Sequence, residues 1–359
     1  MAYNQSLNSE QLHSEVISFL RFPLCVGIVL IHASVNTENC VVCPIYESVY
    51  YLFAQILARV AVPLFFLFSG FLFFNRLDRF TLSVYTEKLR KRIRTLLIPY
   101  LFWNLMTVLY YLLSRFLGGE TQFGAGFTVV DWLELFWDNP ASRTIPGEGI
   151  ASYPICIQFW YIRDLMVVVL LSPVIYWLVR KLRFCFVAIL AVLWVVDCWW
   201  LVTGLNITAL FFFSLGSYCS IYKKNFVELV RTHTLLLGVS YLVMIIPMFV
   251  VEEPNWNPSR RIALLLGMAF VISVVARFVA AGKWKVNKFL SDSSFFIFAY
   301  HTLALMVVAY VTGFSFGTDV LCTMQYIFES VVVVLAGLFV YWLLRRWLPQ
   351  FTAVITGGR

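Results

Sequence analysis

The chain has 359 residues, of which 61% are hydrophobic and only 13% are charged, and its mean hydropathy is +0.83. A soluble globular protein is nearer ~45–50% apolar and ~25% charged, so this composition excludes a soluble enzyme. It predicts an all-α, polytopic integral membrane protein. The net charge of +8 is explained by membrane topology and does not indicate a nucleic-acid partner.

Apolar runs of about 20 residues, separated mostly by short polar loops, predict about ten transmembrane helices. The spans are expected near residues 16–35, 49–74, 95–114, 158–179, 184–202, 205–222, 234–251, 260–280, 289–312 and 322–345. No small-residue cleavage site follows the first run, so we interpret it as a retained span rather than a signal peptide. Residues 1–359 are interpreted as a single transmembrane domain.

Basic residues gather in alternate loops, which predicts the orientation of the chain in the membrane. They are Arg76, Arg79, Lys88, Arg90, Lys91, Arg92, Arg94, Arg180, Lys181, Arg183, Lys223, Lys224, Lys283, Lys285, Lys288, Arg345 and Arg346. Acidic residues occupy the intervening loops. By the positive-inside rule, the basic loops and both termini are cytoplasmic. We therefore expect a multi-pass protein of the cell membrane, of the bacterial inner-membrane type.

Two features of the predicted outer loops, an amphipathic helical pattern and a pair of cysteines, are interpreted as structural. The long loop at roughly 115–157 contains an amphipathic helical pattern at 129–138, interpreted as an interfacial anchor, with a substrate lid as the alternative. Cys40 and Cys43 in the first outer loop can form a disulfide in an oxidising compartment. They lack the further ligands of a metal site, so no metal is expected.

Ionisable groups within spans are the most informative residues, because each costs several kcal/mol unless it is paired or hydrated. Arg21 and His32 are eleven residues apart in the first span, which on a helix is ~20° around the axis and ~16 Å along it. Singly, they fit a snorkelling arginine and a histidine bonded to a carbonyl. Together they predict a functional groove, with Arg21 at its cytoplasmic end and His32 at its outer end.

The second span carries Arg59 well inside it, too far from the cytoplasmic end to snorkel there easily. Pro63 can kink this helix. Ser69 and Gly70 provide a place where a ligand or another helix can approach the backbone closely. Small residues are also ordinary packing devices in membranes, and for Gly70 alone that interpretation is preferred.

A basic run leads into the third span at Arg90, Lys91, Arg92 and Arg94. The positive-inside rule explains most of it. The same cluster would also attract an anionic cytoplasmic ligand, such as a phosphorylated cofactor.

The fourth span begins at the outer face with Trp160 and Tyr161, which fit an aromatic belt. Arg163 and Asp164 lie deeper. Because adjacent residues point in different directions on a helix, each is expected to have a partner elsewhere. Structural ion pairing is an equal alternative to a functional role.

Tyr300 and His301 lie near the middle of the ninth span. A histidine at the membrane midplane is a functional hypothesis by default. Asp197 and Arg277 lie nearer the membrane edges and are interpreted as structural charges.

Taken in order, these segments resemble the membrane acyltransferase-3 family. The resemblance rests on the Arg21–His32 spacing, on ARVAVPLFFLFSGFLF, RIRTLLIPY, FWYIRDL and FFIFAYH, and on the helix count. It extends from the first span to the ninth. Some members have an additional soluble hydrolase-like domain that is lacking here, so we expect this chain to act through membrane-embedded residues alone.

The resemblance implies an O-acetyltransferase-like enzyme that works across a membrane. Cytoplasmic acetyl-CoA, or another acyl-CoA, would be the co-substrate. The acceptor would be a hydroxyl of a glycan or small molecule at the outer face. The implied partners are thus the lipid bilayer, acyl-CoA and an extracytoplasmic acceptor; the acceptor's identity, the acyl length and the oligomeric state stay open.

The resemblance also suggests catalytic roles. His32 is the candidate base for the acceptor hydroxyl, and His301 is an alternative base or an acceptor-orienting group. Arg21 and Arg59 would steady pantetheine, phosphate or the developing oxyanion. Direct transfer and an acyl-histidine route are both open.

The other candidate residues divide between the donor and the acceptor. Cofactor binding is assigned to Arg59, Ser69, Arg90, Lys91, Arg92 and Arg94, and acceptor binding to Trp160, Tyr161, Arg163, Asp164 and Tyr300. The competing hypothesis is a transporter or flippase whose translocation path uses the same charges. A purely structural or sensory subunit is disfavoured by the number of charges within the spans.

Overall fold

The computed structural model is a helical bundle in which the described residues form no β-strand. It describes residues 8–35, 42–77, 79–118, 123–139, 152–200, 202–249, 258–312 and 318–358. The expected all-α class is therefore confirmed.

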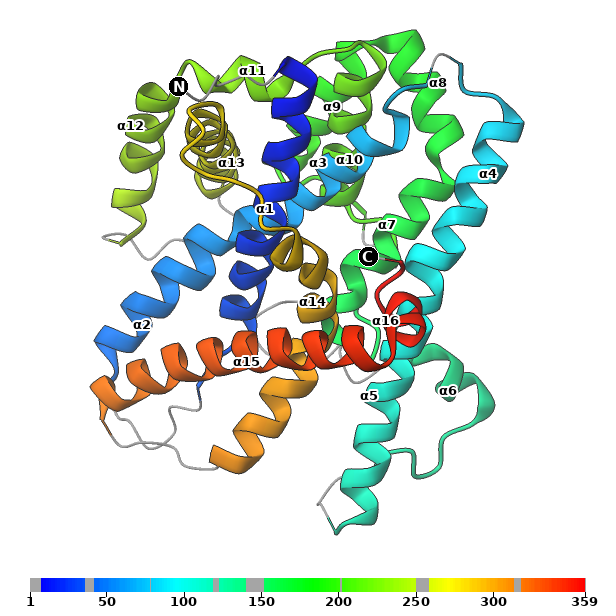
Figure 1. Ribbon diagram of the computed structural model, residues 1–359, viewed down its shortest axis with the longest axis vertical. Coiled ribbons are helices and arrows are strands. Elements are labelled where there is room, and N and C mark those ends of the chain that lie inside the picture. The colour runs from blue at the N-terminus through cyan, green and yellow to red at the C-terminus, as the bar shows by residue number, and fades with distance from the viewer. Residues whose placement is uncertain are drawn as a thin grey trace.

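The helices follow one another as shown in Figure 1. The α-helices are α1 (Ser9–His32), α2 (Pro44–Tyr50), α3 (Ala61–Phe74), α4 (Leu82–Arg92), α5 (Ile98–Phe116), α6 (Val129–Glu134), α7 (Trp160–Leu170), α8 (Ser172–Leu182), α9 (Phe184–Val195), α10 (Ile207–Ile221), α11 (Phe226–Arg231), α12 (Thr234–Ile245), α13 (Pro258–Ala280), α14 (Lys288–Thr312), α15 (Asp319–Trp347) and α16 (Pro349–Ile355). Short π or 3₁₀ segments are η1 (Tyr51–Leu57), η2 (Ala58–Val60), η3 (Ile93–Leu97), η5 (Ile157–Phe159) and η6 (Ile246–Phe249).

Six helices or continuous helix runs are long and apolar enough to cross a membrane, and α7 with α8 forms a further, bent candidate. Three shorter apolar helices lie at 184–195, 207–221 and 234–249. Each expected span overlaps one of these elements, so the multi-pass membrane class is confirmed. The number of helices that cross and the side of the termini stay predictions.

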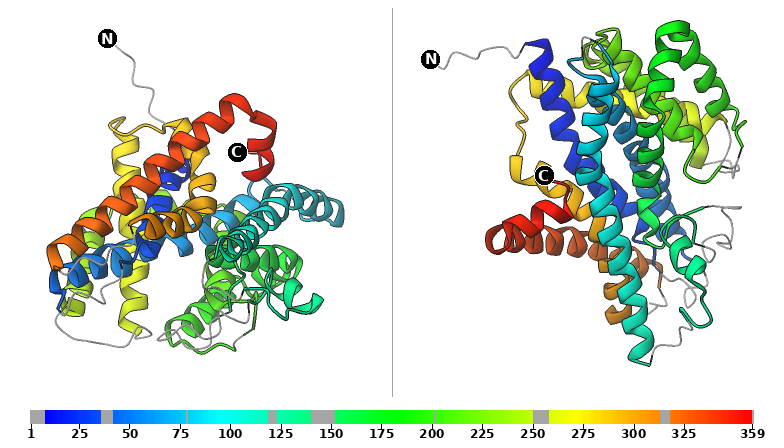
Figure 2. Two further views of the ribbon diagram at one scale, coloured as in Figure 1. Left: turned by 90° about the horizontal axis from the view of Figure 1, so that it is seen from below. Right: turned by 90° about the vertical axis from the view of Figure 1, so that its right-hand side faces the viewer.

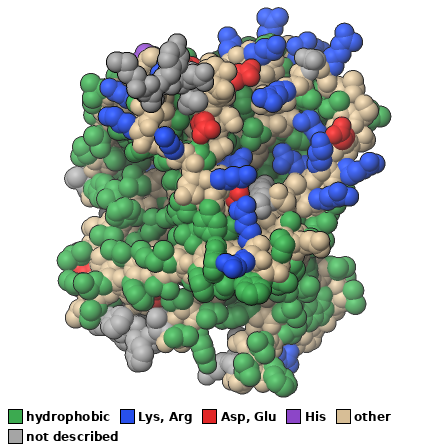
Figure 3. Space-filling view, viewed as in Figure 1, with side chains coloured by type: hydrophobic (Ala, Val, Ile, Leu, Met, Phe, Trp, Pro, Cys, Tyr) green, Lys and Arg blue, Asp and Glu red, His purple; other side chains and the backbone are tan. Residues whose placement is uncertain are grey.

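α1 lies at the centre of the bundle. It packs against α13, α14 and the η1–η2 segment. In Figure 1, α15 passes across the molecule below α1, and the α4–η3–α5 run forms a long rod that is seen from the side in Figure 2. Figure 3 shows Lys and Arg side chains gathered over the upper half of this face and hydrophobic side chains across the lower half.

The bend between α7 and α8 has a local cause. The two helices meet at Leu171 with an angle of 63°. Pro173 stands in the first turn of α8. Proline has no N–H to donate and disfavours α-helical backbone at the residue before it, so the apolar run breaks here.

Glycines allow α3 and α10 to pack with their backbones in close contact. A Cβ on Gly70 would overlap the carbonyl oxygen of Phe213, and a Cβ on Gly216 would overlap that of Leu67. Small residues at such contacts are a common packing device between membrane helices. The packing interpretation of Gly70 is therefore confirmed.

Gly70→Ala is expected to push α3 and α10 apart and to lower the free energy of unfolding by about 1–3 kcal/mol. The measurement is thermal unfolding of the detergent-solubilised protein. Gly27→Ala is the control, because its new Cβ would lie 3.3 Å from the Ala58 side chain and 3.9 Å from the Ala58 carbonyl oxygen, without the overlap found at Gly70. Equal stability losses in the two variants would contradict this account of the α3–α10 contact.

Candidate active site

The face of α1 that carries Arg21 and His32 packs against α14. Between the two residues, Cys25 donates a hydrogen bond from its Sγ to the carbonyl of Ser294, at 3.1 Å. Cys25 is 1% exposed and Ile28 is 3% exposed. Arg21 and His32 share a face of α1, as expected, and α14 covers that face between them.

Both ends of this face meet ionisable residues of α14. Arg21 lies within electrostatic range of Asp292, near the start of α14. The ring centroids of His32 and His301 are 5.2 Å apart, with their planes at 42°. His301 is at the middle of α14, so His32 lies beside the middle of that helix. The structure therefore brings together two histidines from the first and ninth expected spans.

His301 is fully buried, and its tautomer follows from its hydrogen bonds. Nδ1 lies 2.7 Å from the carbonyl oxygen of Phe298 and 3.3 Å from that of Ile297. A carbonyl can only accept, so Nδ1 carries the hydrogen and Nε2 carries the lone pair. Within the described part of the chain, Nε2 has no hydrogen-bond partner. The pair thus combines a buried acceptor nitrogen of His301 with a second histidine, His32, which as a residue is partly exposed.

A buried polar bridge, which the sequence did not suggest, holds α14 on both sides of His301. Gln158 of η5 is 1% exposed and donates from Nε2 to the carbonyl of Ala299, at 2.9 Å. Its Oε1 accepts from the Thr302 hydroxyl at 2.8 Å. A buried network in which the amide nitrogen and oxygen both have partners restricts movement. It fixes the helical turn that carries His301.

Arg59 lies at the His32 end of α1. It is exposed and within electrostatic range of His32. Its Nε and Nη2 both donate to Oε1 of Gln55, the former at 3.0 Å. The helix is irregular here, with the η1 π segment followed by the η2 3₁₀ turn. Pro63 explains part of this irregularity, because it cannot donate to the Arg59 carbonyl four residues earlier.

Gln55 also links Arg59 to the backbone of α1. Its Nε2 donates to the Tyr50 hydroxyl at 3.4 Å, and that hydroxyl donates to the carbonyl of Ile31 at 3.2 Å. Ile31 directly precedes His32. Gln55 and Tyr50 were not expected from the sequence, since single amides and phenols have many structural uses.

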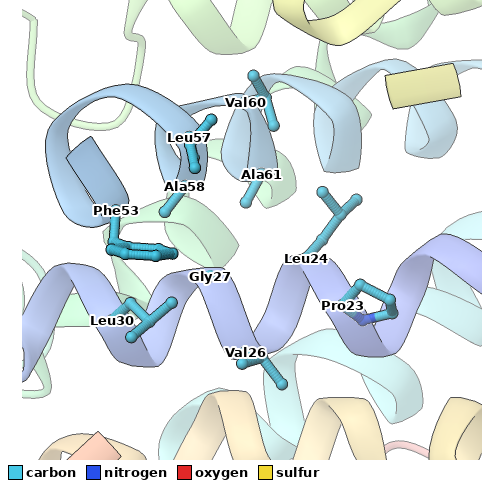
Figure 4. A pocket seen from close by; sticks show the side chains of 10 residues that line it. All are labelled: Pro23, Leu24, Val26, Gly27, Leu30, Phe53, Leu57, Ala58, Val60 and Ala61. Atoms are coloured by element: carbon cyan, nitrogen blue, oxygen red, sulfur yellow. The ribbon is translucent and has the colours of Figure 1, made fainter. Parts of the chain in front are cut away.

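An apolar hollow of ≈190 Å³ lies between α1 and the segment from Phe53 to Ala61. Figure 4 shows its lining side chains, which are Pro23, Leu24, Val26, Gly27, Leu30, Phe53, Leu57, Ala58, Val60 and Ala61. Arg59 belongs to the segment that forms one wall, but its side chain does not line the hollow. The hollow therefore offers an apolar environment near Arg59 and no polar side chain of its own.

Ser69, Tyr161 and Arg92 lie near one another, although the first two come from different expected spans and Arg92 comes from the basic run before a third. The Ser69 and Tyr161 hydroxyls are 3.5 Å apart, and Arg92 is within electrostatic range of Tyr161. The Arg92 guanidinium also lies 5.8 Å from the centre of the Phe73 ring. Tyr161 is 8% exposed and packs 4.7 Å from Phe66. The aromatic-belt interpretation is wrong for Tyr161, because the ring packs inside the bundle.

Trp160 and Tyr300 also pack within the bundle. Trp160 is half-buried, with its ring centroid 6.4 Å from that of Phe66, and its aromatic-belt interpretation stays a prediction. Tyr300, next to His301, donates its hydroxyl hydrogen to the carbonyl of Val333 in α15. That bond joins α14 to α15 beside the histidine pair.

The rest of the basic run forms an exposed cationic surface on α4 and η3. Arg90, Lys91 and Arg94 are all exposed. Lys91 Nζ lies 2.7 Å from Oε1 of Glu87, an exposed ion pair of the kind that adds little stability. Only Arg92 of this run is half-buried, so the four residues do not form one pocket.

Arg163 and Asp164 bind each other, so the expectation that each has its charge partner elsewhere is wrong. Arg163 Nε and Nη2 each lie 3.0 Å from Oδ1 of Asp164, and the two side chains are 3% and 2% exposed. Arg163 also donates to the carbonyls of Trp137 at 2.6 Å and Ser152 at 3.1 Å. The long Arg163 side chain folds back to its neighbour. The different directions of adjacent side chains on a helix do not predict this contact. The pair fastens the long loop to α7.

The long loop contains the expected helix in shorter form, as α6 (Val129–Glu134). Thr128 and Asp131 form a capping box at its start. Hydrogen bonds from the Thr128 backbone and side chain lower the pKa of Asp131. Trp132 packs on a cluster around Leu135, which is 1% exposed. Part of the amphipathic pattern is therefore explained by packing within the protein, and the interfacial role stays a prediction.

Two further observations concern the predicted disulfide and the binding of metal ions. Cys43 is disulfide-bonded, whereas Cys40 lies outside the described residues. Among the residues that the structure describes, no group of three or more His, Cys, Asp or Glu side chains could hold a metal ion.

Glu329 of α15 is a buried acid that was not identified from the sequence. It is 3% exposed and accepts a hydrogen bond from Gln325 Nε2 at 2.8 Å. One turn earlier, Tyr326 donates to the carbonyl of Leu30 in α1, at 3.1 Å. Like Arg59, Glu329 is an ionisable residue inside an expected span. The cost of placing a charge there could therefore have identified it from the sequence.

With this geometry in place, the chain can be compared with known proteins. A family model described as an acyltransferase domain matches residues 15–346. The chain belongs to this family, as the ordered motifs led us to expect. It is therefore a multi-pass membrane acyltransferase.

A curated relative supports this class. The chain is 26% identical to the succinoglycan biosynthesis protein ExoH of Rhizobium meliloti (strain 1021) over 368 residues, which cover 96% of this chain and 92% of that protein. No solved structure matches the chain. The residues from Arg21 to His301 all lie within the part that the family matches.

Arg163→Ala is expected to lower the free energy of unfolding by about 3–5 kcal/mol, because it leaves the Asp164 carboxylate buried without its partner. Chemical unfolding in detergent measures this. The double variant Arg163→Leu with Asp164→Leu is expected to lose less, since no charge is then buried alone.

The matched control is Arg231→Ala, which breaks a 2.9 Å pair with Glu228 whose side chains are 37% and 34% exposed. That variant is expected to lose less than about 1 kcal/mol. If Arg163→Ala lowered the free energy of unfolding no more than Arg231→Ala does, burial of the Arg163–Asp164 pair would have little energetic consequence.

Proposed function

We propose that the protein transfers an acyl group, most simply acetyl, from cytoplasmic acyl-CoA to a hydroxyl group at the outer face of the membrane. The observation that carries the proposal is the His32–His301 pair at the α1–α14 contact of a chain from an acyltransferase family. Histidine is the usual side chain for moving a proton near neutral pH.

His32 is proposed as the general base because the residue is partly exposed, whereas His301 is fully buried. In direct transfer, His32 takes the proton of the acceptor hydroxyl while the oxygen bonds to the acyl carbon. The bond from that carbon to the CoA sulfur breaks, and the sulfur takes up a proton. In the two-step alternative, a histidine nitrogen bonds to the acyl carbon as the bond to the CoA sulfur breaks, and the sulfur takes up a proton. The acceptor oxygen then bonds to the acyl carbon as the bond to histidine breaks, and the hydroxyl proton passes to the released histidine.

His301 would orient the reaction through its bare Nε2, which can accept a hydrogen bond from the acceptor or a proton from it. Its Nδ1 hydrogen is already held by the Phe298 carbonyl. Arg59, near His32, has the charge to stabilise the oxyanion that develops on the acyl carbonyl. Arg21 would steady the phosphate or pantetheine of the donor at the other end of the α1–α14 contact.

The remaining candidates are assigned by their surroundings. The exposed Arg90, Lys91 and Arg94 would attract the phosphates of acyl-CoA to the cytoplasmic face. The nearby Arg92 and Ser69 are proposed for the donor, and Tyr161 for the acceptor.

The acceptor is proposed to be an extracytoplasmic glycan or small molecule. The printed name of the relative ExoH refers to biosynthesis of the polysaccharide succinoglycan, which favours a glycan hydroxyl. The relative is bacterial, in keeping with a bacterial inner membrane as the location. The disulfide at Cys43 is consistent with an outward-facing first loop, since disulfides persist in oxidising compartments.

His32→Ala is expected to lower acyl transfer from acyl-CoA about 10²–10⁴-fold, the usual contribution of a general base. Transfer is measured with purified protein by release of free CoA thiol. His301→Ala is expected to lower the rate as well, while exposed His233 serves as the control at which His→Ala changes nothing. Thermal unfolding checks that each variant is folded.

These measurements distinguish the assignment of the base, the route of transfer and the competing translocation hypothesis. Full activity of His32→Ala would overturn its assignment as base. An acyl group bound to histidine, found by mass spectrometry after incubation without acceptor, would select the two-step route. Failure of acyl-CoA to bind the folded protein at all would overturn the acyl-CoA proposal and favour a translocation role.

A further inference from the structure

An open hollow of ≈350 Å³ lies where the start of α14 meets the end of α15. It is lined by Phe289 of α14 and by Trp342, Arg345 and Arg346 of α15. Two guanidinium groups and two aromatic rings thus border one opening. This composition differs from that of the apolar hollow beside α1, and neither the motifs nor the proposed mechanism accounts for it.

Arg346 and Trp342 are arranged as a cation–aromatic pair. The Arg346 guanidinium carbon lies 5.7 Å from the centre of the Trp342 ring, and Trp342 is 45% exposed. Over the ranges that the structure describes, Arg346 forms no hydrogen bond or ion pair. Its N–H groups are therefore available to an anion from outside the chain, beside the half-exposed Trp342 ring, which also stacks on Phe339 with ring centroids 6.1 Å apart.

Arg345 is held in place by a carboxylate and lies near the proposed catalytic contact. Its Nη1 is 3.3 Å from Oδ2 of Asp292, with the two side chains 47% and 24% exposed. Asp292 is also within electrostatic range of Arg21. One carboxylate of α14 therefore lies between the hollow and the Arg21 end of the α1–α14 contact.

The surroundings of the hollow are positively charged. Lys283, Lys285 and Lys288 precede Phe289 in the chain. In Figure 3, blue Lys and Arg side chains with some red ones among them continue from the upper half of the molecule into its centre. This surface lies on the side of the chain that the positive-inside rule assigns to the cytoplasm.

We propose that this hollow binds the nucleotide end of the acyl donor, with a base stacked on Trp342 and phosphate groups bound by Arg345 and Arg346. Arginine binds phosphate through several N–H groups at once, and aromatic side chains stack on nucleobases. The proposal rests on the proposed use of acyl-CoA. Through Asp292, it sets the nucleotide beside Arg21, at the end of the α1–α14 contact that lies away from the histidines.

A phosphate group can also belong to an anionic lipid, and tryptophan with arginine at a helix end is a common interfacial anchor. The two sources share the same phosphate chemistry. The nucleotide is favoured because a lipid headgroup has no planar ring to stack on the exposed Trp342, and because Asp292 links the hollow to Arg21.

The test compares two donors that differ only in the nucleotide: acetyl-CoA and acetyl-pantetheine. In Arg346→Gln and Trp342→Leu, the ratio of kcat/KM for acetyl-CoA to that for acetyl-pantetheine is expected to fall about tenfold, the usual effect of losing one charge-assisted contact. The Kd for coenzyme A, measured by titration calorimetry in detergent, is expected to rise by a similar factor.

The chain provides a matched control at another helix end. Lys181 lies over the Trp177 ring at 5.0 Å, four residues along α8 as Arg346 is along α15. Lys181→Gln and Trp177→Leu are expected to leave the donor ratio unchanged. Thermal unfolding establishes that all four variants are folded.

Other outcomes would overturn the inference. If both donors lost activity equally in Arg346→Gln, or the donor ratio did not change, the hollow would not bind the nucleotide. If the effect appeared only in vesicles with anionic lipid, a lipid headgroup would be the occupant. If wild-type protein used neither donor, the proposed function itself would fail, independently of these variants.

Discussion

The contact between α1 and α14 is the interaction on which the rest of the candidate site depends. Inside an apolar bundle, water is not there to compensate polar groups, so each must find a partner in the protein. α1 and α14 meet this requirement for most polar groups of one shared face, although Nε2 of His301 has no hydrogen-bond partner among the described residues. Arg21 faces the charge of Asp292, the Cys25 thiol is bonded to the Ser294 carbonyl, and His32 lies beside His301.

The other polar networks hold this contact in place. Gln158 and Thr302 fix the helical turn of His301, while Gln55 and Tyr50 connect Arg59 to the backbone before His32. Each network joins segments that are distant in sequence. A catalytic site needs such supporting hydrogen bonds, because small displacements of a reacting group cause large losses of rate.

Polar side chains also have partners at two other places in the bundle, the long loop beside α7 and the end of α15. On the loop side, the buried Arg163–Asp164 pair uses its remaining donors to hold the carbonyls of Trp137 and Ser152. At the end of α15, Arg345 is held by Asp292, and Arg346 lies against Trp342. The fully buried charges of Arg163 and Asp164 are therefore paired with each other, whereas the exposed Arg59 and Arg346 have N–H groups that can meet a ligand.

The sequence by itself determined the membrane class, the positions of the apolar helices and the family, because these depend on composition, run length and local motifs. It also predicted that Arg21 and His32 share one helical face, since the helical repeat sets that angle. It could not show that α14 covers this face, that Tyr161 packs inward, or that Arg163 folds back onto Asp164. Those features depend on which helices become neighbours and on side-chain rotamers, and only the tertiary structure decides them. For the same reason, the sequence did not predict roles for Gln158 and Gln55, because a single amide has many structural uses. Their hydrogen-bond partners, which depend on the tertiary structure, show what they do.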